Sequence, residues 1–99
     1  MAVEVRETAR FSDWLRGLRD GVARAKIAAR VQRLALGNPG DVRPVGGGVG
    51  ELRVHHGPGY RVYFARRGAQ LVVLLCGGDK STQARDIAEA KSLARQLEE

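Results

Sequence analysis

Cysteine and long apolar segments are scarce in this sequence, and each scarcity excludes a class of protein. The single cysteine, Cys76, rules out an internal disulfide and a metal site built from several cysteines. It lies in the apolar run 71–76, where we expect a small core residue. No segment approaches the ~20 apolar residues needed to cross a bilayer, and the N-terminus lacks the apolar stretch of a secretory signal. We therefore expect a cytoplasmic protein with no membrane association.

Acidic residues are also in the minority. Lys and Arg together number 17 and Asp and Glu number 11, which gives a formal net charge of +6. Arginines greatly outnumber lysines, so the balance favours a partner rich in phosphate or carboxylate, with nucleic acid first. A merely soluble basic protein is the alternative that net charge leaves open. At 99 residues the chain suffices for one hydrophobic core, and we expect a single domain over residues 1–99.

The first half of the sequence predicts a short strand and two amphipathic helices. Residues 3–5 alternate apolar and acidic side chains, as a short strand at a sheet edge does. Thr8 is a candidate N-cap for the first helix, and Asp20-Gly21 separates it from the second, so we expect a helical hairpin. The apolar positions at helical spacing are Phe11, Trp14, Leu15 and Leu18, and then Val22, Ile27, Val31 and Leu34.

The second half predicts a mainly antiparallel sheet and a last helix. Turn-forming residues end the second helix, and we expect a loop over residues 37–48. Two strands of alternating polarity flank the turn at 56–59, and the run 71–76, apolar on both faces, predicts a central buried strand. Ser81 or Thr82 can cap the final helix. The expected order of strand, two helices, three strands and helix is that of an α+β fold.

Strand alternation predicts one polar face on this sheet. If the apolar side chains at 52, 54, 60, 62 and 64 face the helices, the intervening ones share the opposite face. Those intervening residues are Glu51, Arg53, His55, Arg61 and Tyr63.

Cations are concentrated in the part of the sequence that builds this face. Residues 43–85 hold seven of them, against the two acids Glu51 and Asp79. Guanidinium groups bind phosphate in pairs and stack on bases, so the pattern suits single-stranded RNA. A solvated face with cross-strand ion pairs, such as Glu51 with Arg53 or Arg61, is the alternative. The seven cations are Arg43, Arg53, Arg61, Arg66, Arg67, Lys80 and Arg85.

Two further features bear on chemistry. His55 and His56 are adjacent in a predicted strand, so they point to opposite faces and no metal site is expected. His55 is placed to transfer protons near neutral pH, or is simply solvated, and His56 belongs to the turn. The turn over residues 77–83 brings Lys80 to a helix N-terminus, where anions bind, but it lacks the spacing of a triphosphate-binding loop. An ordinary cap, in which Asp79, Ser81 and Thr82 satisfy backbone amides, is the favoured explanation of this turn.

Three segments taken in order resemble a known family. They are residues 48–54, the stretch Gly57-Pro58-Gly59-Tyr60-Arg61 continuing to residue 64, and residues 74–83 with Asp86-Ile87. Together they resemble the killer-protein branch of the RelE/ParE superfamily, also called HigB-like or phage-derived Gp49-like toxins, over nearly the whole chain. The resemblance implies a RelE-like α+β fold: an N-terminal strand and helical hairpin packed on a twisted, mainly antiparallel sheet, a C-terminal helix, and an open basic concave face. It also implies a helix-turn-helix antitoxin that masks this face.

The resemblance further implies a reaction. Ribonuclease members enter the A site of the 70S ribosome, against ribosomal RNA, and cut the messenger there without metal or cofactor, by attack of a ribose 2′-hydroxyl on the adjacent phosphate. Such a reaction needs a proton acceptor, a proton donor and cations beside the phosphate. By resemblance, Arg61 stabilises the phosphate, Lys80 assists it, and Arg53 orients the RNA. The remaining RNA contacts are expected from Arg43, Arg66, Arg67, Gln83 and Arg85.

Proton transfer is where the sequence departs from the family. Several ribonuclease relatives carry a tyrosine or histidine in the C-terminal segment, where this chain has Gln83 and Asp86. The acid and base are therefore expected in His55 and Tyr63, or partly in the ribosome. The departure leaves two alternatives open: a DNA gyrase inhibitor like the ParE branch, and a non-catalytic regulator that binds its antitoxin.

One cationic face lies outside this site. The polar side of the second helix either contacts ribosomal RNA or is solvated, and solvation is what surface helices normally show. Its cations are Arg24, Lys26, Arg30 and Arg33.

Overall fold

The computed structural model describes residues 3–97, and its elements follow the expected order with one addition. The class is α+β, as predicted, and the fold is consistent with a RelE-like arrangement. The elements are β1 (Glu4–Glu7), α1 (Ala9–Gly17), α2 (Gly21–Ala35), β2 (Val42–Gly46), β3 (Val49–Val54), β4 (Tyr60–Arg67), β5 (Leu71–Asp79), a 3-10 turn (Lys80–Thr82) and α3 (Gln83–Leu97).

The five strands form one mixed sheet in the order β1-β5-β4-β3-β2. β1 pairs in parallel with β5 at one edge, and the remaining pairs are antiparallel. This confirms the short edge strand and the antiparallel meander. It also confirms the position of β5 inside the sheet, between β1 and β4.

The loop predicted over residues 37–48 is wrong in part, because it contains β2. This strand pairs with β3 at the other edge of the sheet, and its register shifts between Pro44 and Gly46. Proline lacks the N–H that a ladder needs, so it is tolerated at edges and bulges. The proline and the glycines around it conceal the strand from a search based on alternating polarity.

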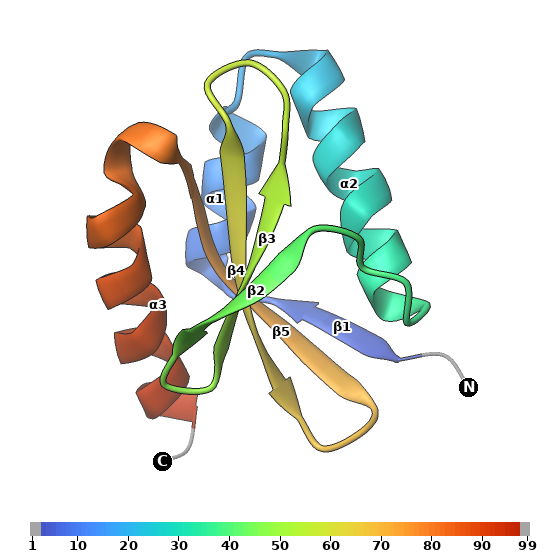
Figure 1. Cartoon of the computed structure of the whole chain (residues 1–99), viewed down its shortest axis with the longest axis vertical. Helices are drawn as coiled ribbons and strands as arrows, with labels where there is room; N and C mark the ends of the chain where they lie inside the picture. Colours follow the sequence, from blue (N-terminus) through green and yellow to red (C-terminus); the bar gives the residue numbers. More distant parts are fainter. Residues whose placement is uncertain (1–2, 98–99) are drawn as a thin grey trace.

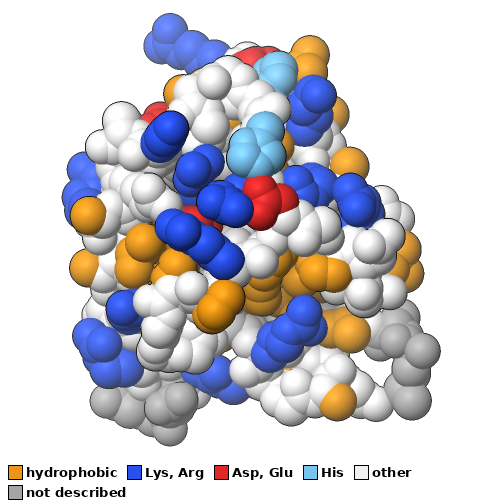
Figure 2. Space-filling view, viewed as in Figure 1, with side chains coloured by type: hydrophobic (Ala, Val, Ile, Leu, Met, Phe, Trp, Pro, Cys, Tyr) orange, Lys and Arg blue, Asp and Glu red, His pale blue; other side chains and the backbone are white. Residues whose placement is uncertain are grey.

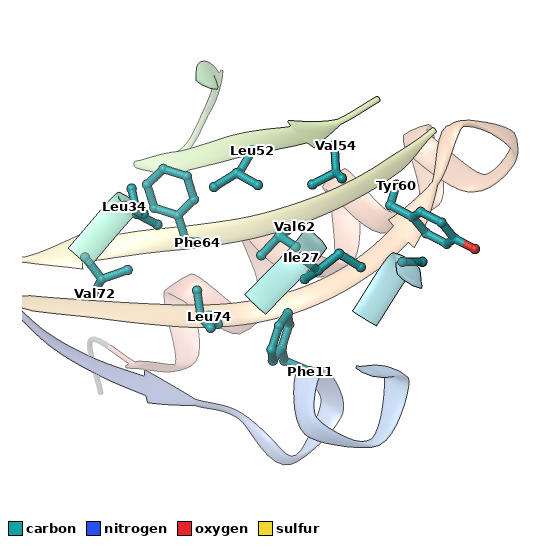
Figure 3. Close-up of a cluster of buried hydrophobic side chains, with 11 residues drawn as sticks. Phe11, Ile27, Leu34, Leu52, Val54, Tyr60, Val62, Phe64, Val72 and Leu74 are labelled. Atoms are coloured by element: carbon teal, nitrogen blue, oxygen red, sulfur yellow. The ribbon is translucent and has the colours of Figure 1, made fainter. Parts of the chain in front are cut away.

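Helices cover both faces of the sheet (Figure 1). The capping residues are as predicted at α1, where the Thr8 hydroxyl accepts a hydrogen bond from Phe11 N, and Asp20 caps α2 by accepting from Val22 N and Ala23 N. α1 and α2 bury their apolar stripes on one face, where Phe11, Ile27 and the inward side chains of β3, β4 and β5 form the main cluster (Figure 3).

α3 covers part of the opposite face and builds a second buried cluster there. Ala90 and Ala94 of α3 pack against Tyr63, Leu75 and Cys76. Cys76 is buried, as expected. The face that the sequence predicts to be open and polar is thus partly apolar and covered. Within the described residues no helix has the length and apolar character to cross a membrane.

Candidate functional site

A hollow of about 530 Å³ lies where β3 gives way to β4, and we call it the turn hollow. Its walls come from three elements: β3, the turn and start of β4, and the 3-10 turn after β5. Figure 2 shows lysine and arginine side chains gathered with the two histidines on one face of the molecule. The lining residues are Arg53, His55, His56, Gly57, Pro58, Gly59, Arg61 and Lys80.

Arg61 forms the inner wall of the turn hollow. It pairs with Arg53 across β3 and with Gly78 across β5, and only 7% of it is exposed. One terminal nitrogen donates to Gly59 O at 3.1 Å, whereas the buried Nε has no hydrogen-bond partner among residues 3–97. Buried donors are normally satisfied, so a cation with an unused N–H beside a hollow is suited to an anion.

Asp41, to which the sequence pattern assigns no role, organises another wall. Its Oδ1 accepts from Arg53 Nε and a terminal nitrogen at 3.2 and 2.7 Å, and its Oδ2 lies 2.5 Å from His55 Nε2. These hydrogen bonds, first from Arg53 and then from His55, lower the pKa of Asp41 to about 2. The carboxylate therefore stays ionised and holds Arg53 and His55 in place. Its position in a turn-forming segment gave no chemical signal in the sequence.

His56 is anchored by a different carboxylate. Its Nε2 lies 3.0 Å from Asp20 Oδ2, and this contact is the main reason that the pKa of Asp20 is lowered. The prediction that both histidines lie in a strand and point to opposite faces is wrong, whereas the prediction that His56 belongs to the turn is confirmed. β3 ends at Val54, so both histidines belong to the turn and both line the turn hollow. No cluster of three or more His, Cys, Asp or Glu side chains in the described chain is arranged to hold a metal ion.

Lys80 contributes the third cation from the turn between β5 and α3. Asp79 caps this turn, accepting from the Ser81 amide and hydroxyl, and the hydroxyl contact lowers the pKa of Asp79. Asp79 thus caps the 3-10 turn, and the Thr82 hydroxyl, just before α3, donates to Asp86 Oδ2. Lys80 itself is exposed, with its Cβ beside Gly59.

Glu51 and Tyr63 do not lie on an open face, and the expectation that they do is wrong; Gln83, expected to contact RNA, is half-buried beside them. Glu51 and Tyr63 are each 0% exposed, because α3 packs over this part of the sheet. Glu51 accepts from Arg43 Nε, Tyr63 OH and Gln83 Nε2 at 3.0, 3.0 and 2.8 Å. The ion pair is with Arg43, and not with Arg53 or Arg61.

The charge states in this buried network follow from its contacts. Burial opposes the charged form of Glu51, but the hydrogen bonds from Gln83, Tyr63 and Arg43 outweigh it and keep the pKa below its ordinary value. Burial, with the hydrogen bond to Glu51, strongly raises the pKa of Tyr63. These hydrogen bonds join the N-terminal end of α3 to the sheet.

The other predicted RNA-binding cations lie outside the turn hollow. Arg43 and Arg66 border a separate hollow beside β2, and Arg66 lies 5.8 Å from the ring centre of Phe64. Arg67 donates to the Ala94 carbonyl of α3. Arg85 is exposed on α3, with Nε 3.6 Å from Asp86 Oδ1. The structure thus brings together Arg53, Arg61, Lys80 and His55 and adds His56. None of these four arginines lines the turn hollow.

Comparison with known proteins gives two matches. Residues 13–98 match the family described as phage derived protein Gp49-like (DUF891). An uncharacterized protein of Haemophilus influenzae strain Rd is 50% identical over 97 residues, which cover 98% of this chain and 98% of that protein.

Proposed function

Because the chain belongs to the phage-derived Gp49-like family, a HigB-like toxin family, we propose that it is the toxin of a toxin–antitoxin pair and a ribosome-dependent messenger RNA endoribonuclease. The family itself supports the toxin–antitoxin context broadly. The cleavage activity, its substrate and the antitoxin partner belong to the proposal. Its place of action is then the cytoplasm, on messenger bound to the 70S ribosome.

The observation that carries the proposal is the buried guanidinium of Arg61, whose Nε has no hydrogen-bond partner among residues 3–97, at the inner wall of a hollow with three cations. In-line attack by a 2′-hydroxyl adds negative charge to the phosphate in the transition state. Preorganised donors aimed at that charge are commonly the largest catalytic contribution. The terminal nitrogens of Arg61 supply such donors, while Lys80 and Arg53 complete the cationic walls.

Proton transfer in this proposal uses the histidines. His55 accepts the proton of the attacking 2′-hydroxyl, and the phosphate–5′-oxygen bond breaks as the new 2′-oxygen–phosphorus bond forms. The 5′-oxygen takes a proton from His56, so the products are a 2′,3′-cyclic phosphate and a 5′-hydroxyl. Tyr63 donates to Glu51 away from the hollow. In this scheme it maintains the sheet and α3 rather than transferring a proton.

The partner in the proposal is a helix-turn-helix antitoxin. An antitoxin that blocks cleavage must keep RNA from the turn hollow, whose cations and open shape suit an acidic segment of a partner equally well. Growth arrest on expression of the toxin alone, relieved by co-expression of the antitoxin, is the expected result.

The test is mapping of 5′ ends on a messenger translated in a purified system. Wild-type protein is compared with Arg61→Ala, His55→Ala and a ribosome-free reaction, and Arg95→Ala on α3 serves as an arginine control. We expect cleavage that needs ribosomes, falls at least a hundredfold in Arg61→Ala and is unchanged in Arg95→Ala, as expected when a transition-state donor is lost (~10²-fold or more).

Two other results would lead to other functions. Growth arrest without cleavage, together with loss of supercoiling by DNA gyrase, would point to a gyrase inhibitor. Absence of both activities in a folded protein that alters operator binding by its antitoxin would point to a regulator.

A further inference from the structure

A second hollow, of about 360 Å³, adjoins the turn hollow on the surface of α2, and we call it the α2 hollow. His55 lines both, so the two are continuous at this side chain. The lining residues are Lys26, Ala29, Arg30, Arg33, Val54 and His55.

The α2 hollow holds cations that form no ion pair with a carboxylate of the described residues. Arg30 donates to the carbonyl oxygens of Pro39, Arg53 and Asp41 at 2.7–3.3 Å, and so it is held by neutral groups alone. Side chains of Lys26 and Arg33 make no hydrogen bond or ion pair with any residue between 3 and 97. α2 itself contains no acidic residue.

Electrostatic strain accompanies this arrangement. Burial, followed by the charge of Arg33, lowers the pKa of Arg30. The carboxylate of Asp41 acts on Arg30 but is already engaged by Arg53 and His55. Like charges held together without a counter-charge are an arrangement that an anion stabilises. The expectation that this helix face is merely solvated is wrong for Arg30, which is fixed between α2 and the 37–41 turn.

The residues that line the α2 hollow indicate which class of anion it can bind. Its lining combines the apolar side chains of Val54 and Ala29 with the cations Lys26, Arg30 and Arg33. Phosphate oxygens suit the cations, while a ribose or base suits the apolar side chains. A nucleotide has both parts.

We propose that the α2 hollow binds a nucleotide of the RNA strand that flanks the phosphate held at Arg61. The inference rests on the proposed function, which makes RNA the substrate. The RNA strand would then run from the turn hollow, past His55, onto α2. Lys26 and Arg33 contact phosphate, and Arg30 fixes the 37–41 turn against α2. An acidic segment of a protein partner is the competing occupant, and the continuity of the two hollows favours RNA.

The test measures binding and cleavage separately on the full chain. Binding is read by fluorescence anisotropy with a 12-nucleotide single-stranded RNA whose 2′-oxygens are methylated and which therefore resists cleavage. Lys26→Ala/Arg33→Ala is expected to weaken binding about tenfold or more, as loss of two charge-assisted contacts does. The slope of log K against log salt is expected to fall by about 1.4, at ~0.7 per phosphate contact on a single strand.

A second pair of variants distinguishes RNA binding in the α2 hollow from a general effect of the protein's net charge. Ala29→Glu places a carboxylate in the α2 hollow, and Ala88→Glu makes the same change at an exposed position of α3 on the opposite side of the sheet. We expect Ala29→Glu to weaken RNA binding about tenfold, and Ala88→Glu to change it less than twofold. Equal losses in the two variants would reduce the effect to net charge and overturn the proposal.

The remaining outcomes are equally definite. Unchanged RNA affinity and salt slope in Lys26→Ala/Arg33→Ala overturn the proposal, and if the same variant loses its antitoxin, the occupant is the acidic partner. If Arg61→Ala keeps full cleavage while the α2 variants still lose RNA affinity, the proposed catalytic site fails and the α2 site stands.

Discussion

Asp41 Oδ2 lies 2.5 Å from His55 Nε2, and the same carboxylate holds Arg53 through its other oxygen. Asp41 belongs to the turn after α2, which Arg30 fixes by donating to the Pro39 and Asp41 carbonyls. The orientation of two side chains in the turn hollow thus depends on a segment outside the sheet. The negative charge of Asp41 maintains this orientation of Arg53 and His55.

Asp41→Asn is expected to remove a pH-dependent part of the stability. The pKa of Asp41 is lowered from 3.8 to about 2 in the folded protein, so its contribution is complete above pH 3.8 and is lost as the pH falls towards 2. The free energy of unfolding in urea should therefore favour wild type over Asp41→Asn at pH 7, with a difference that closes between pH 4 and 2. The lowered pKa values of Asp20 and Asp79 are common to both proteins and cancel. A difference that stays constant with pH would contradict this assignment.

Glu51 is expected to be among the most sensitive polar positions. Glu51→Ala leaves the hydroxyl of Tyr63 and the amide of Gln83 without their acceptor in a buried space, and breaking such a network costs about 3–5 kcal/mol. Tyr63→Phe removes one donor to a carboxylate, at about 1.5–3 kcal/mol. Urea unfolding measures both. Glu4→Ala, whose ion pair with Arg6 is exposed, should cost less than about 1 kcal/mol, and a similar value for Glu51→Ala would be inconsistent with the network.

Gly77→Ala is expected to destabilise the protein by about 1–3 kcal/mol. A Cβ at residue 77 would lie 2.3 Å from ring atoms of Trp14, so α1 has to shift away from β5. The matched control is Gly17→Ala at the end of α1, where nothing lies within 4 Å and the better helix former should be neutral or slightly stabilising. Thermal unfolding of the two variants tests this, and equal melting temperatures would show that Trp14 does not pack on β5.

Cys76 is expected to be unreactive in the folded protein and reactive in the unfolded one. Burial raises the pKa of its thiol to about 12, and Sγ donates to the Asp86 carbonyl of α3 at 3.6 Å. Alkylation by a neutral maleimide at pH 8 should therefore follow the opening of α3 from the sheet. Fast labelling under native conditions, with full secondary structure, would mean that α3 is not held down.

The sequence predicts the parts of this fold that depend on periodicity. Thr8 as a cap, β1 at an edge and the buried β5 are all in place. β2 is missed because its proline and glycines carry turn signals, and the buried state of Tyr63 is missed because alternation gives a face without saying what covers it. An amphipathic helix such as α3 reveals its apolar stripe, but not the face of the sheet to which it docks.

The candidate site, too, is predicted from the sequence only in part. Arg61, Lys80, Arg53 and His55 are brought together, because three of them follow from strand register and the turn after β5. Asp41, Asp20 and Arg30 are not predicted, since their roles arise from contacts between segments distant in sequence. The roles assigned to all these residues stay predictions until the variants are measured.

The parallel pairing of β1 with β5 has a consequence for how the protein is made. The Thr8 hydroxyl donates to the Leu75 carbonyl, 67 positions later in the chain, so β1 has no partner until β5 has been made. Contacts this distant in sequence form late in folding. Arg61 and Lys80 acquire their fixed positions only when β4 and β5 are paired. A growing chain therefore cannot assemble the site before the segment from β4 to Lys80 has been made and paired.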